Sequence, residues 1–224
     1  MSIEGVWPAA GLRIAAGDLE LRWITDELLV RLAELAGRGV HTPETMPFTV
    51  PWTRGTPQQV ARTLIAYQWG ARSQFDARSM RLELAVVRRG EPVGVQAAWG
   101  DGWAVLREAE TGSWLGRAHQ GQGIGTRMRV LMLWLLFEGL GAAHVVSTAF
   151  ADNVSSNATS RRVGYEPDGR SRVDRDGQAA TRHRHRMSVE RWEAVRAQNA
   201  ELLGGPVVMT GVERARDQLK QVRG

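Results

Sequence analysis

At its centre the chain reads Gln120-Gly121-Gln122-Gly123-Ile124-Gly125-Thr126, directly before a long apolar stretch at 128–140. Three glycines at alternate positions remove Cβ atoms from this turn, which lets an anion approach the main chain closely. The apolar stretch predicts a buried helix, whose unpaired first-turn N–H groups and dipole favour a negative charge, above all a phosphate. The sequence therefore predicts a phosphate-binding turn where this helix begins.

Two common phosphate-binding motifs do not fit this turn. The nucleoside-triphosphate loop ends in Gly-Lys-Ser/Thr, whereas this turn ends in Gly125-Thr126-Arg127 without a lysine. The dinucleotide fingerprint, counted from Gly121, would need its third glycine at Thr126. A pyrophosphate-binding turn of another kind remains. The alternative is a glycine-rich turn that only joins a strand to a helix.

Hydrophobic periodicity predicts an α/β fold around this turn. We expect strands at 19–24, 81–88, 93–99, 104–115, 144–150, 165–169 and 181–189. We expect helices at 25–37, 57–74, 125–137, 153–163 and 189–203, with a proline-rich loop at 42–57. This order predicts a mainly antiparallel N-terminal half and one parallel strand pair around the buried helix.

Length and composition predict one domain at 1–203, followed by a tail or short helix at 204–224. The chain has 224 residues, of which 43% are hydrophobic, and this is enough to bury one core. It contains no cysteine, which excludes a disulfide framework, a thiolate nucleophile and a zinc–thiolate site. The longest apolar run, 130–137, is too short to span a membrane, and the N-terminus lacks the apolar core of a signal peptide. We therefore expect a cytoplasmic protein without membrane contact.

The net charge of +5 raises the question of a nucleic-acid partner. The basic residues are mostly arginines mixed with acids, and no aromatic residues are interleaved in a binding pattern. The densest cluster consists of Arg170, Arg172, Arg175, Arg182, Arg184 and Arg186. A solvated turn and strand edge explains this cluster, and the alternative is attraction to an acidic partner such as coenzyme phosphates or a ribosomal surface. Nucleic-acid binding is not expected.

Three motifs together resemble the GNAT superfamily of acyl-CoA-dependent N-acyltransferases. The hallmark of that family, Gln/Arg-x-x-Gly-x-Gly/Ala, is matched at residues 120–125. The family's Asn-x-x-Ser and Lys-x-Gly-Phe/Tyr segments are similar to Asn153-Val154-Ser155-Ser156 and Arg162-Val163-Gly164-Tyr165. The Glu-Ile-Gly-Tyr-Trp-Leu strand of its Rim-type branch, the ribosomal-protein N-terminal acetyltransferases, is similar to Glu110-Thr111-Gly112-Ser113-Trp114-Leu115. The motifs occur in the family's order within 19–192.

The resemblance implies a central twisted, mostly antiparallel sheet of about seven strands with flanking helices, and acetyl-CoA as co-substrate. The family's fourth and fifth strands splay apart, and here the splay would fall near Trp114 and Ser147. Such a splay frees backbone groups that can hold the pantetheine amides and polarise the thioester. Gln120 would help to shape the loop, and main-chain N–H groups of 122–126 would hold the pyrophosphate. The implied coenzyme-binding residues are Trp114, Leu115, Gln120, Gly121, Gln122, Gly123, Ile124, Gly125, Thr126, Asn153 and Ser156.

Acyl transfer to an amine requires an unprotonated amine and a route for its proton, which a carboxylate can accept through water. Glu110 is the first candidate base, because it occupies the glutamate position of the strand motif. Glu108 is the second, because alternate residues of a strand face the same side. The alternative for both is a solvated strand glutamate.

Ser160 stands where the family often carries a tyrosine that protonates the departing thiolate. The Rim-type branch also tends to carry a serine there, which would act as a hydrogen-bond donor or water relay. The alternative is a polar residue on the helix surface. Asn153 and Ser156 would contact the coenzyme, and the alternative for Asn153 is a helix N-cap.

Candidate acceptor-binding residues are Trp52, Trp69, Ser147 and Tyr165. The tryptophans fall in the loop and the helix that would cover the acceptor site. An aromatic-lined pocket is one interpretation of them, and core packing is the other, as it is for Tyr165. No metal site is expected, because the pair at 183 and 185, both histidines, has no carboxylate or cysteine cluster beside it.

We therefore predict an N-acetyltransferase that moves an acetyl group from acetyl-CoA to a primary amine by direct attack in a ternary complex. The acceptor is either a protein N-terminus or a small-molecule amine. One alternative is a catalytically silent acyl-CoA-binding or regulatory module. Another is an N-acyltransferase that uses a longer acyl-CoA in a biosynthetic or resistance pathway. A homodimer is compatible with the sequence.

Overall fold

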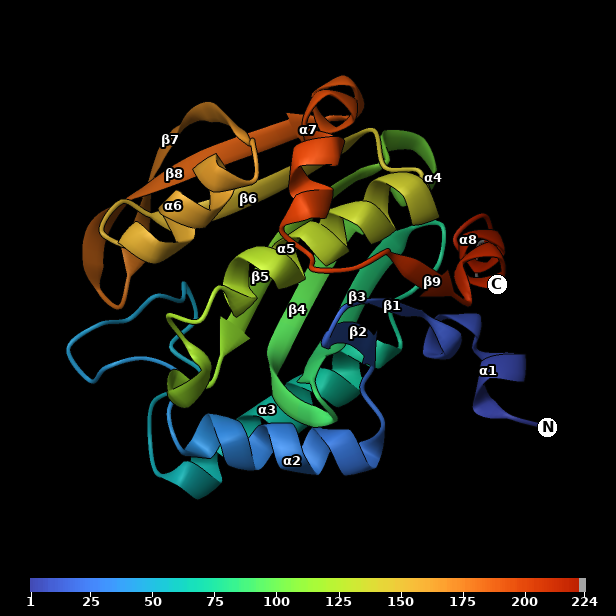
Figure 1. Cartoon of the computed structure of the whole chain (residues 1–224). Coiled ribbons are helices and arrows are strands. Elements are labelled where there is room, and N and C mark those ends of the chain that lie inside the picture. Colours follow the sequence, from blue (N-terminus) through green and yellow to red (C-terminus); the bar gives the residue numbers. More distant parts are fainter. Residues whose placement is uncertain (222–224) are drawn as a thin grey trace.

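A nine-stranded mixed sheet runs through residues 1–221, which are those that the computed structural model describes. Its strands are β1 (Arg13–Ala16), β2 (Leu19–Trp23), β3 (Ser79–Arg88), β4 (Glu91–Asp101), β5 (Glu108–Leu115), β6 (His144–Phe150), β7 (Glu166–Arg175), β8 (Gln178–Ser188) and β9 (Val208–Thr210). They lie in the order β7-β8-β6-β5-β4-β3-β2-β1-β9 (Figure 1). Of these neighbours β5 and β6 are parallel, and the others are antiparallel. The predicted α/β sheet with one parallel pair is confirmed, and β1 and β9 are additional to the expected strands.

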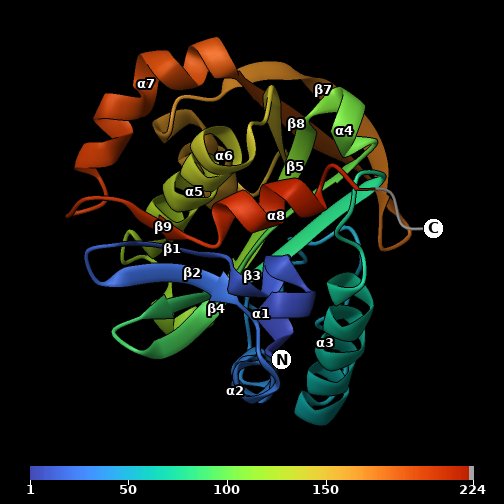
Figure 2. The same cartoon turned by 90° about the vertical axis from the view of Figure 1, so that its right-hand side faces the viewer.

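Helices cover both faces of the sheet (Figure 1 and Figure 2). On one face lie α2 (Asp26–Gly37) and α3 (Pro57–Arg72), and on the other lie α5 (Ile124–Trp134) and α7 (Val189–Glu201). The remaining helices are α1 (Ile3–Val6), α4 (Trp103–Leu106), α6 (Val154–Arg162) and α8 (Val212–Gln218), with 3-10 turns at Pro8–Gly11 and Arg117–His119. The Thr25 and Thr56 hydroxyls cap α2 and α3 by accepting backbone N–H groups. A π-helical segment, Leu135–Leu140, continues α5.

Alternate residues of the central strands face different helices, which determines the side on which each site residue lies. On β3, Leu84 and Val86 pack with α5 in the larger core. Ala85 and Val87 pack with α2 and α3 in a second core. We call these two sides the α5 face and the α2/α3 face. Residues 130–133 of α5 are fully buried, as the apolar stretch predicts.

The parallel strands β5 and β6 separate part of the way along their length. Their paired residues run from Glu108 opposite His144 to Thr111 opposite Ser147. Beyond this point β5 still pairs with β4 as far as Leu115, whereas its pairing with β6 has ended. We call this separation the fork. It confirms the splay that the resemblance implies near Trp114 and Ser147.

One predicted strand begins later than expected. Residues 104–107 do not extend β5, because they belong to the short helix α4 and its end, where Arg107 has a left-handed φ of 46°. The segment after 204 contains a short helix, α8, which was one of the two expectations for it. It also packs against the rest of the chain, since β9 pairs with β1 and Ala215 of α8 is fully buried. Gln218 Oε1 accepts the Ala9 N–H at 3.0 Å, which ties the two ends of the chain together. Residues 222–224 of the predicted tail lie outside the described residues.

Glu83 on β3 is a buried carboxylate, and burial raises its pKa above the usual 4.5. The Tyr67 hydroxyl donates to it at 2.6 Å and the Gln68 amide at 3.2 Å. The native state therefore keeps this proton to higher pH than the unfolded chain does. The resulting stability is fully present below pH 4.5 and is lost as the pH rises through the raised pKa. We expect Glu83→Gln to abolish this loss, which amounts to at most about 1.4 kcal/mol per pH unit.

Urea unfolding of wild type and Glu83→Gln between about pH 4 and about pH 8 measures this difference. The matched control is Glu91→Gln, because the Glu91 side chain is 73% exposed at the beginning of β4. We expect the control to keep the wild-type pH dependence. Equal pH dependence in wild type and Glu83→Gln would contradict the argument from burial.

Candidate functional site

The loop 120–126 leads into the start of α5. Residues 120–123 are exposed, Ile124 is buried, and 125–126 are half-buried. Gly121 and Gly123 have left-handed φ values of 72° and 74°, a conformation that favours glycine. A Cβ atom added at either glycine would meet no other atom within 4 Å. Arg127 N donates to Gly123 O, so the N–H groups of 124–126 precede the first hydrogen bond of the helix. An anion can therefore reach these N–H groups, and the residues present fit a diphosphate.

Two glutamines hold this loop in shape. Gln120 Nε2 donates to Val40 O at 2.7 Å and to Leu115 O at 2.9 Å, which fastens the loop to the end of β5. Gln122 Nε2 donates to Ala118 O at 2.8 Å. These contacts fix the positions of both glutamine side chains against the backbone around the loop.

An arginine cluster that the sequence analysis missed lies beside the loop. Asp18 forms ion pairs with Arg88 at 3.0 Å, Arg127 at 2.7 Å and Arg89 at 3.3 Å. Hydrogen bonds from Arg88 and Arg127 lower the Asp18 pKa to about 2. Arg88 also donates to Gln122 Oε1 at 2.9 Å, which joins the cluster to the loop. Three arginines against one carboxylate leave a net positive charge, which favours a phosphate ligand.

Five polar residues meet on the α5 face of the fork. They are Thr111, Arg129, Ser147, Ser160 and Tyr165, and all are buried. Ser147 Oγ accepts from Arg129 Nη1 at 2.8 Å and from Ser160 Oγ at 3.4 Å. The Tyr165 hydroxyl lies 3.5 Å from Thr111 Oγ1, and burial raises the Tyr165 pKa. The structure thus brings three predicted residues together, and Ser160 is fully buried rather than on the helix surface.

Glu110 lies on the opposite side of the sheet, the α2/α3 face. It is paired with Trp99, four positions from the pair Trp114 and Val95, which packs in the second core. Thr148 Oγ1 on β6 donates to Glu110 Oε1 at 2.5 Å. A carboxylate on one side of the fork can accept a proton from an attacking group. The hydroxyls on the other side can donate hydrogen bonds to a leaving group.

Glu108 lies on the same face of β5 as Glu110 but is held in ion pairs. Arg184 approaches it at 3.2 Å and Arg186 at 3.7 Å, both from β8. Arg184 is also 3.3 Å from Asp168. The two strand glutamates therefore have different surroundings, and Glu110 has no arginine partner within residues 1–221.

An aromatic cluster lies on the α2/α3 face near the end of β5. Trp52 contacts Trp114 and Phe48, with ring centroids 5.8 Å and 5.2 Å apart. His41 contacts Phe48 at 5.9 Å. Trp69 does not join this cluster, because its side chain is exposed on α3. Of the two tryptophans that were candidates for the acceptor site, Trp52 in the loop therefore belongs to this aromatic cluster, whereas Trp69 on α3 does not.

The start of α6 has the geometry of a helix cap. Asn153 Oδ1 accepts the Ser156 N–H at 3.1 Å, so the N-cap alternative for Asn153 is confirmed. Asn157, one turn later, donates to Phe150 O at 2.9 Å and lies 3.0 Å from His185 Nε2. His185 is buried, and burial lowers its pKa.

Other features of the described residues contribute no further site. A cavity of about 390 Å³ is lined by residues such as Trp7, Phe75 and Gln218, none of which belongs to the predicted site. Within residues 1–221 no three His, Cys, Asp or Glu side chains are grouped as a metal ion would require. Over the same residues, no helix has the length and apolar character needed to cross a membrane.

Comparisons with known proteins agree with this architecture. A family model described as Acetyltransferase (GNAT) domain matches residues 18–166. A GCN5-related N-acetyltransferase from Brucella melitensis is 18% identical, with a TM-score of 0.66 over 91% of this chain and 94% of that chain. RimJ from Mycobacterium smegmatis, in complex with CoA-disulfide, is 19% identical, with a TM-score of 0.59 over 82% and 92%. RimL, a ribosomal L7/L12 alpha-N-protein acetyltransferase in complex with coenzyme A, is 18% identical, with a TM-score of 0.60 over 79% and 97%.

Proposed function

The chain belongs to the GNAT acetyltransferase family, and from this membership we propose that it transfers the acetyl group of acetyl-CoA to a primary amine by direct attack in a ternary complex. The observation that carries the proposal is the loop 120–126. Open main-chain N–H groups precede α5 there, beside an arginine cluster of net positive charge. These are the features that a coenzyme diphosphate requires.

The chain's own residues divide the work of binding the coenzyme. The N–H groups of 122–126 would hold the diphosphate, with Gly121 and Gln120 shaping the loop. The pantetheine arm would lie in the fork, along Trp114 and Leu115 of β5. Asn153 and Ser156 at the start of α6 would line the side of the fork that β6 provides. The bound acetyl-CoA supplies an activated acyl group.

Glu110 is the proposed base. As the amine nitrogen bonds to the thioester carbon, its proton passes to Glu110 directly or through water. The short hydrogen bond from Thr148 supports this role, because it orients the carboxylate beside the fork. Glu108 forms ion pairs with Arg184 and Arg186. We therefore assign it the role of holding these two arginines in place, and not that of the base. Ser160 would act on the thiolate side, where its hydroxyl donates to Ser147.

The acceptor that we propose is a protein N-terminus. The likeness to RimJ and RimL supports this assignment, together with the similarity of residues 110–115 to the Rim-type strand. A small-molecule amine is the second candidate, and the aromatic cluster of Phe48, Trp52 and Trp114 favours it, because such rings can line a pocket for an apolar amine.

Mass spectrometry of purified protein with acetyl-CoA tests both candidates. One panel contains peptides with free N-termini, and each has an N-terminally blocked counterpart that retains a lysine side chain. A second panel contains small apolar and polar amines. We expect acetylation of the free N-termini and not of the blocked peptides. Transfer to small amines alone would favour the second candidate, and no transfer to any amine would contradict the proposed activity.

A further inference from the structure

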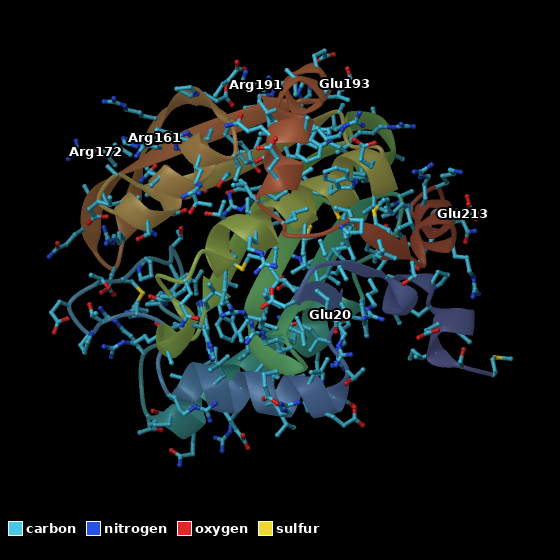
Figure 3. All side chains as sticks on the ribbon, viewed as in Figure 1. Glu20, Arg161, Arg172, Arg191, Glu193 and Glu213 are labelled. Carbon is cyan, nitrogen blue, oxygen red and sulfur yellow. The ribbon has the colours of Figure 1, made fainter. Side chains whose placement is uncertain are left out.

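Arg129 on α5 is a buried guanidinium without a carboxylate partner. Its exposed fraction is 4%, and its Nε has no hydrogen-bond partner. In the described part of the chain, no Asp or Glu forms an ion pair with it. Arg161 and Arg172, by contrast, extend outward from the surface near α6 and β7 (Figure 3). A charge removed from water without a counter-ion is costly, so its position points to a negative charge that it meets during function.

Arg129 contacts the point at which β5 and β6 separate. Its Nη1 donates to Ser147, which together with Thr111 forms the last paired position before β5 and β6 separate. Tyr165 and His185 are the titratable neighbours. Burial raises the pKa of Tyr165 and lowers that of His185, so both are neutral near pH 7. Arg129 therefore supplies the positive charge at the α5 side of the fork.

In the proposed reaction, one side of the fork must accept a proton and the other must stabilise a negative charge. The nitrogen lone pair forms the C–N bond, the C–S bond breaks, and its electron pair leaves with sulfur as a thiolate. The amine proton goes toward Glu110 on the α2/α3 face. The new negative charge therefore needs stabilisation away from Glu110, which is where Arg129 lies.

Resting on the acetyl-CoA site proposed above, we propose that Arg129 is a positioning residue that stabilises the departing CoA thiolate through Ser147 and Ser160. Ser147 Oγ accepts from both Arg129 and Ser160, which leaves the hydrogen of Ser147 itself for an acceptor in the fork. The guanidinium orients the Ser147 hydroxyl, and its positive charge stabilises a negative charge nearby. A sulfur atom in the fork would thus meet a donor backed by a full positive charge.

The test uses CoA itself, because its thiol reports the field directly. The ultraviolet absorbance of the thiolate gives the pKa of CoA bound to wild type, Arg129→Lys and Arg129→Met. We expect a bound thiol pKa below about 8 in wild type, and about 8.5 or above in Arg129→Met. Arg129→Lys keeps the charge and is expected to lie between them. The kcat of Arg129→Met should fall by roughly 10²-fold, with little change in the CoA dissociation constant.

Thermal unfolding separates this role from a structural one. If Arg129 acts on the thiolate, replacing this unpaired buried charge by an apolar side chain of similar length should not lower the Tm. If Arg129 were needed for the fold instead, the Tm of Arg129→Met would fall. Equal bound thiol pKa values in wild type and Arg129→Met would overturn the inference and leave the proposed activity intact. If Arg129→Met does not fold, wild type alone decides. A thiol pKa of bound CoA equal to that of free CoA would then overturn the inference. Failure of wild type to bind CoA would instead contradict the proposed function.

Discussion

Replacing Glu110 by glutamine is expected to lower kcat by about 10²-fold or more while the dissociation constant of acetyl-CoA stays close to that of wild type. The physical reason is the loss of a proton acceptor. A glutamine keeps the shape of the side chain and still offers an oxygen to Thr148, so the contact at 2.5 Å can persist. Steady-state kinetics and calorimetric titration with acetyl-CoA measure the two quantities.

Glu108→Gln is the matched control, because Glu108 lies two residues earlier on the same face of β5. Its carboxylate is engaged with Arg184 and Arg186, and we expect a much smaller loss of kcat. An unchanged kcat in Glu110→Gln would contradict its role as the base. A wild-type protein that binds acetyl-CoA but never transfers the acetyl group would favour the silent binding module.

Gly125→Val is expected to weaken CoA binding by about 10- to 100-fold, which corresponds to one charged hydrogen bond of about 1.5–3 kcal/mol. The family's hallmark allows alanine at this position, so the test needs a larger side chain. Gly125 lies in the first turn of α5, and a side chain there tilts toward the helix N-terminus, where the diphosphate would rest. The protein itself has room for the Cβ atom, since its nearest atom would be Leu115 Cδ1 at 4.0 Å. Calorimetric titration with CoA measures the loss.

Gly70→Val in α3 is the matched control for this substitution. Gly70 is also a helical glycine, and a Cβ added there would meet nothing within 4 Å. Neither valine should lower the Tm markedly, because the helix propensity of valine is not below that of glycine. We expect Gly70→Val to bind CoA as wild type does. Equal affinities for the two variants would argue against a diphosphate at the N-terminus of α5.

Local patterns predicted much of the fold and the loop. The strand at 144–150, most of whose residues are buried, and the capped helices after Thr25 and Asn153 occur as expected, because hydrophobic runs and side-chain caps act over a few residues. Gly121 and Gly123 of the loop adopt left-handed backbone where the motif predicts a turn. The fork followed from the resemblance to a known family.

Contacts between distant segments could not be predicted in this way. β9 contains three residues and is a strand only because β1 lies beside it. The arginine cluster joins Asp18, Arg88 and Arg127 from three elements, so no local motif announces it. Arg129 stands within an apolar helix pattern, and its burial without a carboxylate becomes visible only in three dimensions. A single arginine in an otherwise apolar stretch was the one signal that the sequence contained.

Calorimetric titration of the wild-type protein with acetyl-CoA and with acetyl-pantetheine tests the central claim most directly. The two ligands share the thioester and the pantetheine arm, and the second lacks the diphosphate and the nucleotide. We predict that acetyl-CoA binds at least about 10²-fold more tightly, because the diphosphate engages the N–H groups of 122–126. Equal affinities for the two ligands, or no binding of acetyl-CoA, would contradict the account.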